Sequence, residues 1–229
     1  MVRLTWYDRF AKEITMTYKN AYRGIEKIHI AEIMLIIGTF LLSLVQALFS
    51  TKDFEKIINE IGMSFGVIIL IVIVIGMILT IAADIYNIWG LKIASLDDRM
   101  FYIPFFLSIL IIIADTVMGI ILMITDRESI NLIIDRLEEI VELVQMVVVI
   151  VVSSKLAKTL NGTSHIKKSK VVLWIIIANV VFSFGLGASS LLTDAHNKVL
   201  YGISEALEII SFIVYLIYVD MTIKFLKKN

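Results

Sequence analysis

Six apolar segments, each long enough to cross a bilayer as a helix, constrain this chain more than any other feature. They cover residues 28–49, 61–85, 101–124, 139–157, 171–192 and 200–223. A helix needs about 20 residues to cross a hydrocarbon layer of about 30 Å, and these segments lack the alternating pattern of barrel strands. The chain is also 59% hydrophobic with a single proline, outside the range of soluble domains. The sequence therefore predicts an all-α integral membrane protein with six transmembrane helices.

Two of these segments predict helices that extend beyond their apolar cores. The fourth has a short core, VQMVVVIVV, and the charged stretch DRLEEIVE precedes it. We expect one long helix there that begins near Ser129. The second segment continues through ADIYNIWGLKIAS, which favours a helical extension at the membrane surface.

Lysine and arginine are distributed unequally between the two sides of the predicted membrane topology. Of the 21 such residues, 16 fall in segments on one side. The other side has Lys52, Lys56, Arg127, Arg136 and Lys198. Cytoplasmic loops hold the excess of these residues. The sequence therefore predicts a multi-pass protein of the cell membrane with both termini in the cytoplasm, which agrees with an even number of spans.

The first 27 residues precede the first apolar segment. Trp6, Phe10, Ile14, Ala21 and Ile25 recur there at close to helical spacing, with cations between them. This pattern is typical of an amphipathic helix that lies on the cytoplasmic surface of the membrane. The alternative is a soluble arm docked on the loops.

The outer turns indicate an internal repeat. STKD at 50–53, ITDR at 124–127 and LTDA at 192–195 each contain a threonine followed by an aspartate. We therefore expect residues 28–229 to form three tandem helical hairpins, at about 28–100, 101–170 and 171–229. Threonine and aspartate also cap helices generally, so descent from a duplicated gene stays open.

An aspartate interrupts the third segment, IIIADTVMGIIL at 111–122. A carboxylate at the centre of a membrane helix costs about 2.5–3.5 kcal/mol, so it usually faces protein or water. Counting from the outer turns places Asp115, Glu142, Glu205 and Glu208 at similar depth, with no lysine, arginine or histidine at their level. Unpaired buried carboxylates must take up a proton, bind a cation or reach water.

Polar residues also line one face of two predicted helices. On the sixth they are Tyr201, Ser204, Glu208, Ser211, Tyr215 and Thr222, and on the fourth Glu138, Glu142, Gln145 and Ser153. Such stripes are expected to face the bundle interior. The candidate ligand-binding residues are therefore Asp115, Glu142, Glu205, Glu208, Ser211 and Tyr215. The alternative is structural, because polar residues often only join membrane helices, at about 0.6 kcal/mol per contact.

Small residues gather at two places. Gly62 and Gly66 form a GxxxG motif, and GLGASS occupies residues 185–190. Both predict close helix packing. For GLGASS, a broken helix that exposes backbone carbonyls to an ion is the alternative.

Several function classes find no support in the sequence. The chain has no cysteine and three scattered histidines, so we expect no metal site and no cysteine nucleophile. It also has no phosphate-binding glycine loop. We therefore expect neither an enzyme nor a cofactor, and no nucleic-acid partner.

The remaining hypothesis is a membrane protein that binds or translocates a small solute, either cationic or proton-coupled. The alternatives are a non-catalytic subunit with structural polar residues, or the substrate-binding component of a larger transporter. The candidate partners are the lipid bilayer, a small cation or proton, and a second copy or another membrane subunit.

Overall fold

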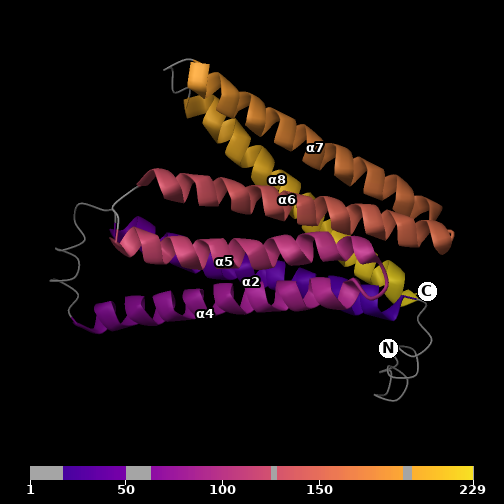
Figure 1. The fold of residues 1–229 in the computed structure, drawn as a ribbon, viewed down its shortest axis with the longest axis horizontal. Helices are drawn as coiled ribbons and strands as arrows, with labels where there is room; N and C mark the ends of the chain where they lie inside the picture. Colours follow the sequence, from indigo (N-terminus) through magenta and orange to yellow (C-terminus); the bar gives the residue numbers. More distant parts are fainter. Residues whose placement is uncertain (1–17, 50–62, 125–127, 193–197, 229) are drawn as a thin grey trace. The chain divides into compact units, whose positions relative to one another are not determined.

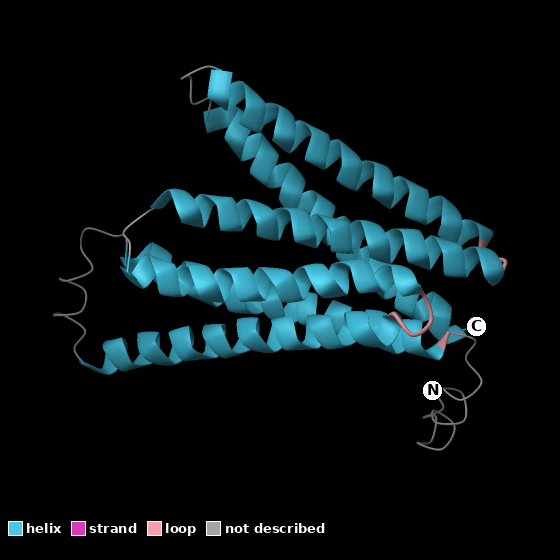
Figure 2. Ribbon diagram, in the orientation of Figure 1, coloured by secondary structure: helices cyan, strands magenta, loops and turns pink. Residues whose placement is uncertain are grey.

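The computed structural model describes residues 18–49, 63–124, 128–192 and 198–228, and these ranges are helical apart from short connections. The long helices are α2 (Lys19–Phe49), α4 (Met63–Ala94), α5 (Tyr102–Ile124), α6 (Glu128–Thr159), α7 (Thr163–Leu192) and α8 (Lys198–Lys228). A single 3-10 turn, η1 (Arg99–Phe101), precedes α5. Figure 2 shows helices joined by loops, with no strand in the described ranges.

The described helices define a multi-pass membrane protein. Within the described residues, four stretches are long and apolar enough to cross a bilayer, by length and composition: Lys19–Ala47, Gly66–Ala94, Ile140–Thr159 and Ile209–Lys228. A shorter apolar stretch, Arg99–Ala114, covers η1 and the first part of α5. The arrangement of six spans in three hairpins stays a prediction.

Two expected helix extensions are confirmed. α6 begins at Glu128, one residue from the predicted start, and continues as one helix to Thr159. α4 continues through the stretch after its apolar core and ends at Ala94.

The first helix crosses the boundary that the sequence places at residue 27. α2 is continuous from Lys19, and its side chains Ala21, Tyr22 and Ile25 are buried in the protein. Residues 1–17, which would form most of the predicted surface helix, lie outside the described residues. The described start of α2 therefore packs against protein.

The chain divides into two compact units, of which one is Glu26–Gly90. In this unit α2 and α4 approach closely at Gly38 and Gly76, because a Cβ atom at Gly38 would lie 3.0 Å from the carbonyl oxygen of Gly76. Near the other end of the pair, the Lys27 ammonium lies 3.5 Å from the ring centroid of Trp89.

Close packing at the GxxxG motif is not found in the described part of this unit. A Cβ atom at Gly66 would have nothing within 4 Å, so the prediction for Gly66 is wrong. Gly62 lies outside the described residues, and the side chains of 185–190 are not described.

The other unit comprises Met1–Ile25 and Leu91–Asn229. In its described part α5 packs on α6, α6 on α7 and α7 on α8 (Figure 1). Val148, Val149 and Val152 of α6 are buried, because α6 contacts both of its sequence neighbours. Pro104 is tolerated in the first turn of α5, where a missing N–H removes no helical hydrogen bond.

The turn between α6 and α7 is a Schellman motif. The N–H of Gly162 donates to the carbonyl of Ala157 at 2.7 Å, and the N–H of Asn161 donates to Lys158 at 3.3 Å. Asn161 takes the left-handed conformation that this motif requires, with φ of 56°. The turn reverses the chain within three residues and places the start of α7 beside the end of α6.

Candidate functional site

Two of the predicted ligand-binding residues, Ser211 and Tyr215, lie inside the bundle. They are 6% and 0% exposed. Glu142 is exposed on α6, so the expected inward placement is wrong for this residue. Asp115 occupies a position in α5, and Glu205 and Glu208 occupy positions in α8, but the side chains of these three residues lie outside the described part. The described side chains therefore include one of the four predicted carboxylates.

The polar stripe of α8 is buried over its described length. Tyr218 and Thr222 follow Ser211 and Tyr215 at spacings of three and four residues, and all four are shielded from solvent. Residues at this spacing share one helix face. The predicted inward placement is therefore confirmed for Ser211, Tyr215 and Thr222.

The neighbouring helices bury polar side chains as well. Gln145 and Ser153 are buried on α6, and His165 and Ser169 are buried on α7. None of these residues carries a formal charge when His165 is neutral. The described interior of α6, α7 and α8 is thus a neutral polar seam.

Four residues of this seam form a reciprocal clasp between α7 and α8. His165 Nε2 lies 3.1 Å from Thr222 Oγ1, and Ser169 Oγ lies 2.7 Å from the hydroxyl of Tyr218. Each short hydroxyl donates to a carbonyl one turn back on its own helix: Thr222 to Tyr218 at 3.0 Å, and Ser169 to His165 at 2.9 Å. Because those two protons are committed, His165 Nε2–H and the Tyr218 hydroxyl must donate across the helix pair.

The clasp determines the state of His165. Its ring stacks on Tyr218 and Phe225, with centroid distances of 5.2 and 4.8 Å. Burial, and then the positive charge of Lys168, lower the pKa of His165 below its ordinary value of 6.5. The imidazole is therefore neutral at pH 7, with its proton on Nε2.

A second polar network joins the start of α2, η1 and the end of α6. Asp97 accepts hydrogen bonds from Asn20 Nδ2 at 2.9 Å and from the N–H of Ala21 at 2.7 Å. Asp98 accepts from the N–H of Met100 and pairs with Lys155. Burial alone would raise the pKa of Asp98, but the hydrogen bonds from Lys155 and Met100 and the lysine charge outweigh it and lower that pKa.

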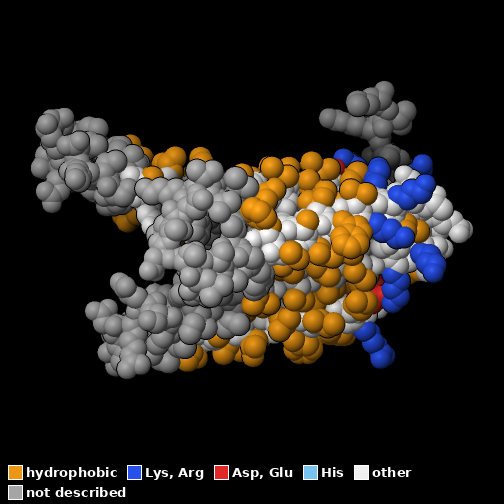
Figure 3. Space-filling view, turned by 90° about the horizontal axis from the view of Figure 1, so that it is seen from above, with side chains coloured by type: hydrophobic (Ala, Val, Ile, Leu, Met, Phe, Trp, Pro, Cys, Tyr) orange, Lys and Arg blue, Asp and Glu red, His pale blue; other side chains and the backbone are white. Residues whose placement is uncertain are grey.

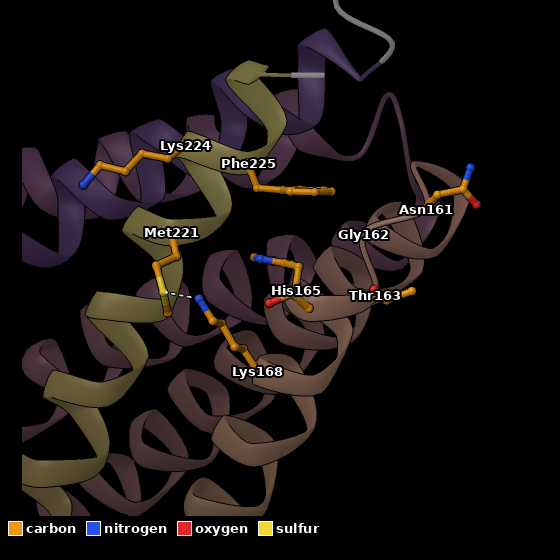
Figure 4. A pocket seen from close by; sticks show the side chains of 9 residues that line it. Asn161, Gly162, Thr163, His165, Lys168, Met221, Lys224 and Phe225 are labelled. Carbon is orange, nitrogen blue, oxygen red and sulfur yellow. Dashed lines mark hydrogen bonds between the residues drawn. The ribbon is translucent and has the colours of Figure 1, made fainter.

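The clasp lies beside an open cavity of about 450 Å³ at the α6–α7 turn (Figure 4). Its walls are residues 161–165, Lys168, Met221, Lys224 and Phe225. In Figure 4 the Phe225 ring faces His165, and Lys168 reaches across to Met221. A Cβ atom at Gly162 would lie 2.6 Å from Phe225 Cζ, so only glycine leaves room for this ring.

Lys168 and Lys224 line the cavity, and further lysines lie on the same ends of the three helices. We call this region the basic end of the unit, defined by the following lysines of α6, α7 and α8: Lys155, Lys158, Lys167, Lys168 and Lys224. Antiparallel packing brings together the end of α6, the start of α7 and the end of α8. Figure 3 shows lysine and arginine side chains gathered at one end of the visible face, next to apolar side chains.

The described residues contain no group of three histidine, cysteine or acidic side chains that could hold a metal ion. Sequence reasoning found part of the seam and missed the rest. The α8 periodicity identified Ser211, Tyr215 and Thr222. Tyr218 was missed although it lies on the same face, and His165 and Ser169 were missed because their role depends on which helix α7 meets.

Comparison with protein-family models, curated proteins and solved structures finds no match for this chain. Its class therefore rests on the fold, which is that of a multi-pass α-helical membrane protein with a neutral polar seam between helices.

Proposed function

We propose that this membrane protein binds or translocates a small solute, cationic or proton-coupled, through a polar interior on α6 and α8. The observation that supports the proposal is the burial of Ser211 and Tyr215 on the stripe that also contains position 208. Glu208 precedes Ser211 by three residues, so its backbone position shares that face. We further propose that the protein has no catalytic activity of its own.

The two parts of the seam differ in chemistry. At the basic end, Ser169 and Thr222 accept hydrogen bonds from Tyr218 and His165 across the α7–α8 pair, so these bonds hold the two helices together. Farther along α8, the stripe passes Ser211 toward glutamate positions 208 and 205. A carboxylate in an apolar bundle needs a proton, a cation or water, and hydroxyl groups nearby can complete the coordination of any of these. We therefore assign solute binding to this outer part.

A second candidate function is a membrane subunit whose polar residues only join helices. The clasp favours it, because the hydroxyl protons of Ser169 and Thr222 end on carbonyls and leave no continuous path for a proton. In this proposal the protein transports nothing itself and acts by binding a partner such as another membrane subunit.

The test uses the purified full-length protein and the neutral isosteres Glu208→Gln and Asp115→Asn. One arm measures thermal stability in Na⁺, K⁺ or N-methylglucamine at fixed pH and ionic strength. The other measures proton entry into proteoliposomes with an internal pH dye. We expect the wild-type protein to be stabilised by one of the cations or to admit protons. Each isostere should reduce that cation effect or proton flux at least tenfold, because it removes the ionisable group.

Glu128→Gln is the matched control, since it neutralises a glutamate at the first residue of α6 and should keep the wild-type response. The solute proposal is wrong if the wild-type protein responds in neither arm, or if Glu208→Gln and Asp115→Asn both respond as wild type does. Those results would favour the structural subunit.

A further inference from the structure

Independently of the solute proposal, we propose that the α7–α8 surface at the basic end binds an acidic glycerophospholipid. The lipid phosphate lies beside Lys168 in the cavity, and one acyl chain follows an apolar groove on α7 and α8. The shape of two adjoining hollows, the charge of their lysines and their position along α7 each support this occupant.

A second hollow shares two lining residues with the cavity. A groove of about 350 Å³ is lined by Lys167, Lys168, Val171, Val172 and Met221. Lys168 and Met221 belong to both hollows. A cavity with lysines in its wall thus adjoins an apolar groove, as the headgroup and the chain of one lipid molecule require.

The charge at this junction is uncompensated among the described groups. The Lys168 ammonium lies 3.7 Å from the sulfur of Met221, and no carboxylate in the described part of the chain pairs with it. Lys167 is exposed beside it, and Lys224 at the rim is held by Asp220 on its own helix. The cavity therefore has an excess of positive charge next to an apolar wall, which favours an anion that brings its own apolar part.

The groove lies where α7 changes from basic to apolar residues, as expected at the boundary between lipid headgroups and acyl chains. α7 changes from the basic stretch HIKKSK to the apolar stretch VVLWIII at Val171. Trp174, one turn further, is 70% exposed. Tryptophan is enriched at membrane interfaces, and basic pockets between helices on the cytoplasmic side bind acidic headgroups. A soluble anion would use the cavity and leave the groove empty.

The experiment is native mass spectrometry of the full-length protein in neutral detergent, titrated with dioleoyl phosphatidylglycerol or dioleoyl phosphatidylcholine. We expect the acidic lipid to bind the wild-type protein at least tenfold more tightly. The double variant Lys167→Gln with Lys168→Gln should weaken phosphatidylglycerol binding roughly thirtyfold, since it removes two surface lysines that each attract acidic lipid. Glycerol 1-phosphate provides the headgroup chemistry without the chains and should not compete at equal concentration.

The matched control is Lys227→Gln with Lys228→Gln, which removes the same charge from exposed positions near the same end of α8 but outside both hollows. It should change phosphatidylglycerol binding less than twofold. Equal binding of the two lipids, or equal losses in the two double variants, would leave only general electrostatics and overturn the proposal. Competition by glycerol 1-phosphate at equal concentration would show a soluble-anion site instead, which also contradicts it.

Discussion

His165 shows how a titratable side chain can be kept inside an apolar helix bundle without a counter-ion. Its Nε2–H donates to Thr222, and aromatic rings cover the imidazole. An unpaired charge at this position would cost more than the neutral ring does, because the charged form loses its hydration. The neighbouring Lys168 adds to this preference by repelling a second positive charge. His165 is thus a neutral hydrogen-bond donor at physiological pH.

The lowered pKa of His165 makes stability depend on pH. The unfolded chain binds a proton below about pH 6.5, whereas the folded chain resists it until the pH falls further. Stability from this residue is therefore complete above that pH and is lost as the pH decreases. We expect the thermal midpoint to fall between pH 7.5 and pH 5.5, and His165→Gln, which cannot titrate, to show a smaller fall. An identical fall in wild type and variant would contradict this account.

At the scale of the elements, the described helices pair in two different ways. α7 and α8 are joined by side-chain hydrogen bonds, which fix their register because His165 must meet Thr222 while Ser169 meets Tyr218. α2 and α4 are joined by backbone approach at Gly38 and Gly76. Association of membrane helices relies on both close packing and polar contacts, because lipid removes the hydrophobic driving force between them.

The glycine contact leads to a graded prediction. Gly38→Ala would place a Cβ atom 3.0 Å from the carbonyl oxygen of Gly76 and 3.2 Å from Leu79 Cβ, and neither atom can move without its helix. We expect it to destabilise the protein by about 1–3 kcal/mol, the usual cost of overpacking. Thermal unfolding in detergent measures the change. Gly66→Ala is the control because its Cβ would meet open space, and an equal loss there would contradict the packing explanation.

At the scale of the whole molecule, the sequence predicted the helices better than their contacts. Segment length located all six helices, and the start predicted near Ser129 lies one residue from the observed start of α6 at Glu128. The periodicity of α8 predicted the burial of Ser211 and Thr222, since helical spacing is a local property. The glycine pair, the clasp and the Asp98–Lys155 pair could not be predicted, because residues up to 57 positions apart meet there only through the packing of helices.

Six spans require α5 and α7 to cross the membrane in addition to the four stretches that length and composition support in the described residues, and the crossing of α7 can be tested directly. The chain contains no cysteine, so a single introduced thiol reports its own location without background. Ser164→Cys lies at the exposed start of α7 and Ala195→Cys in the connection between α7 and α8. With a cytoplasmic basic end, a membrane-impermeant maleimide should label position 195 in intact cells, and position 164 only after permeabilisation. Labelling of both positions from the same side would show that α7 does not cross, and the opposite pattern would reverse the orientation and place the basic end and its lipid cavity in the outer leaflet.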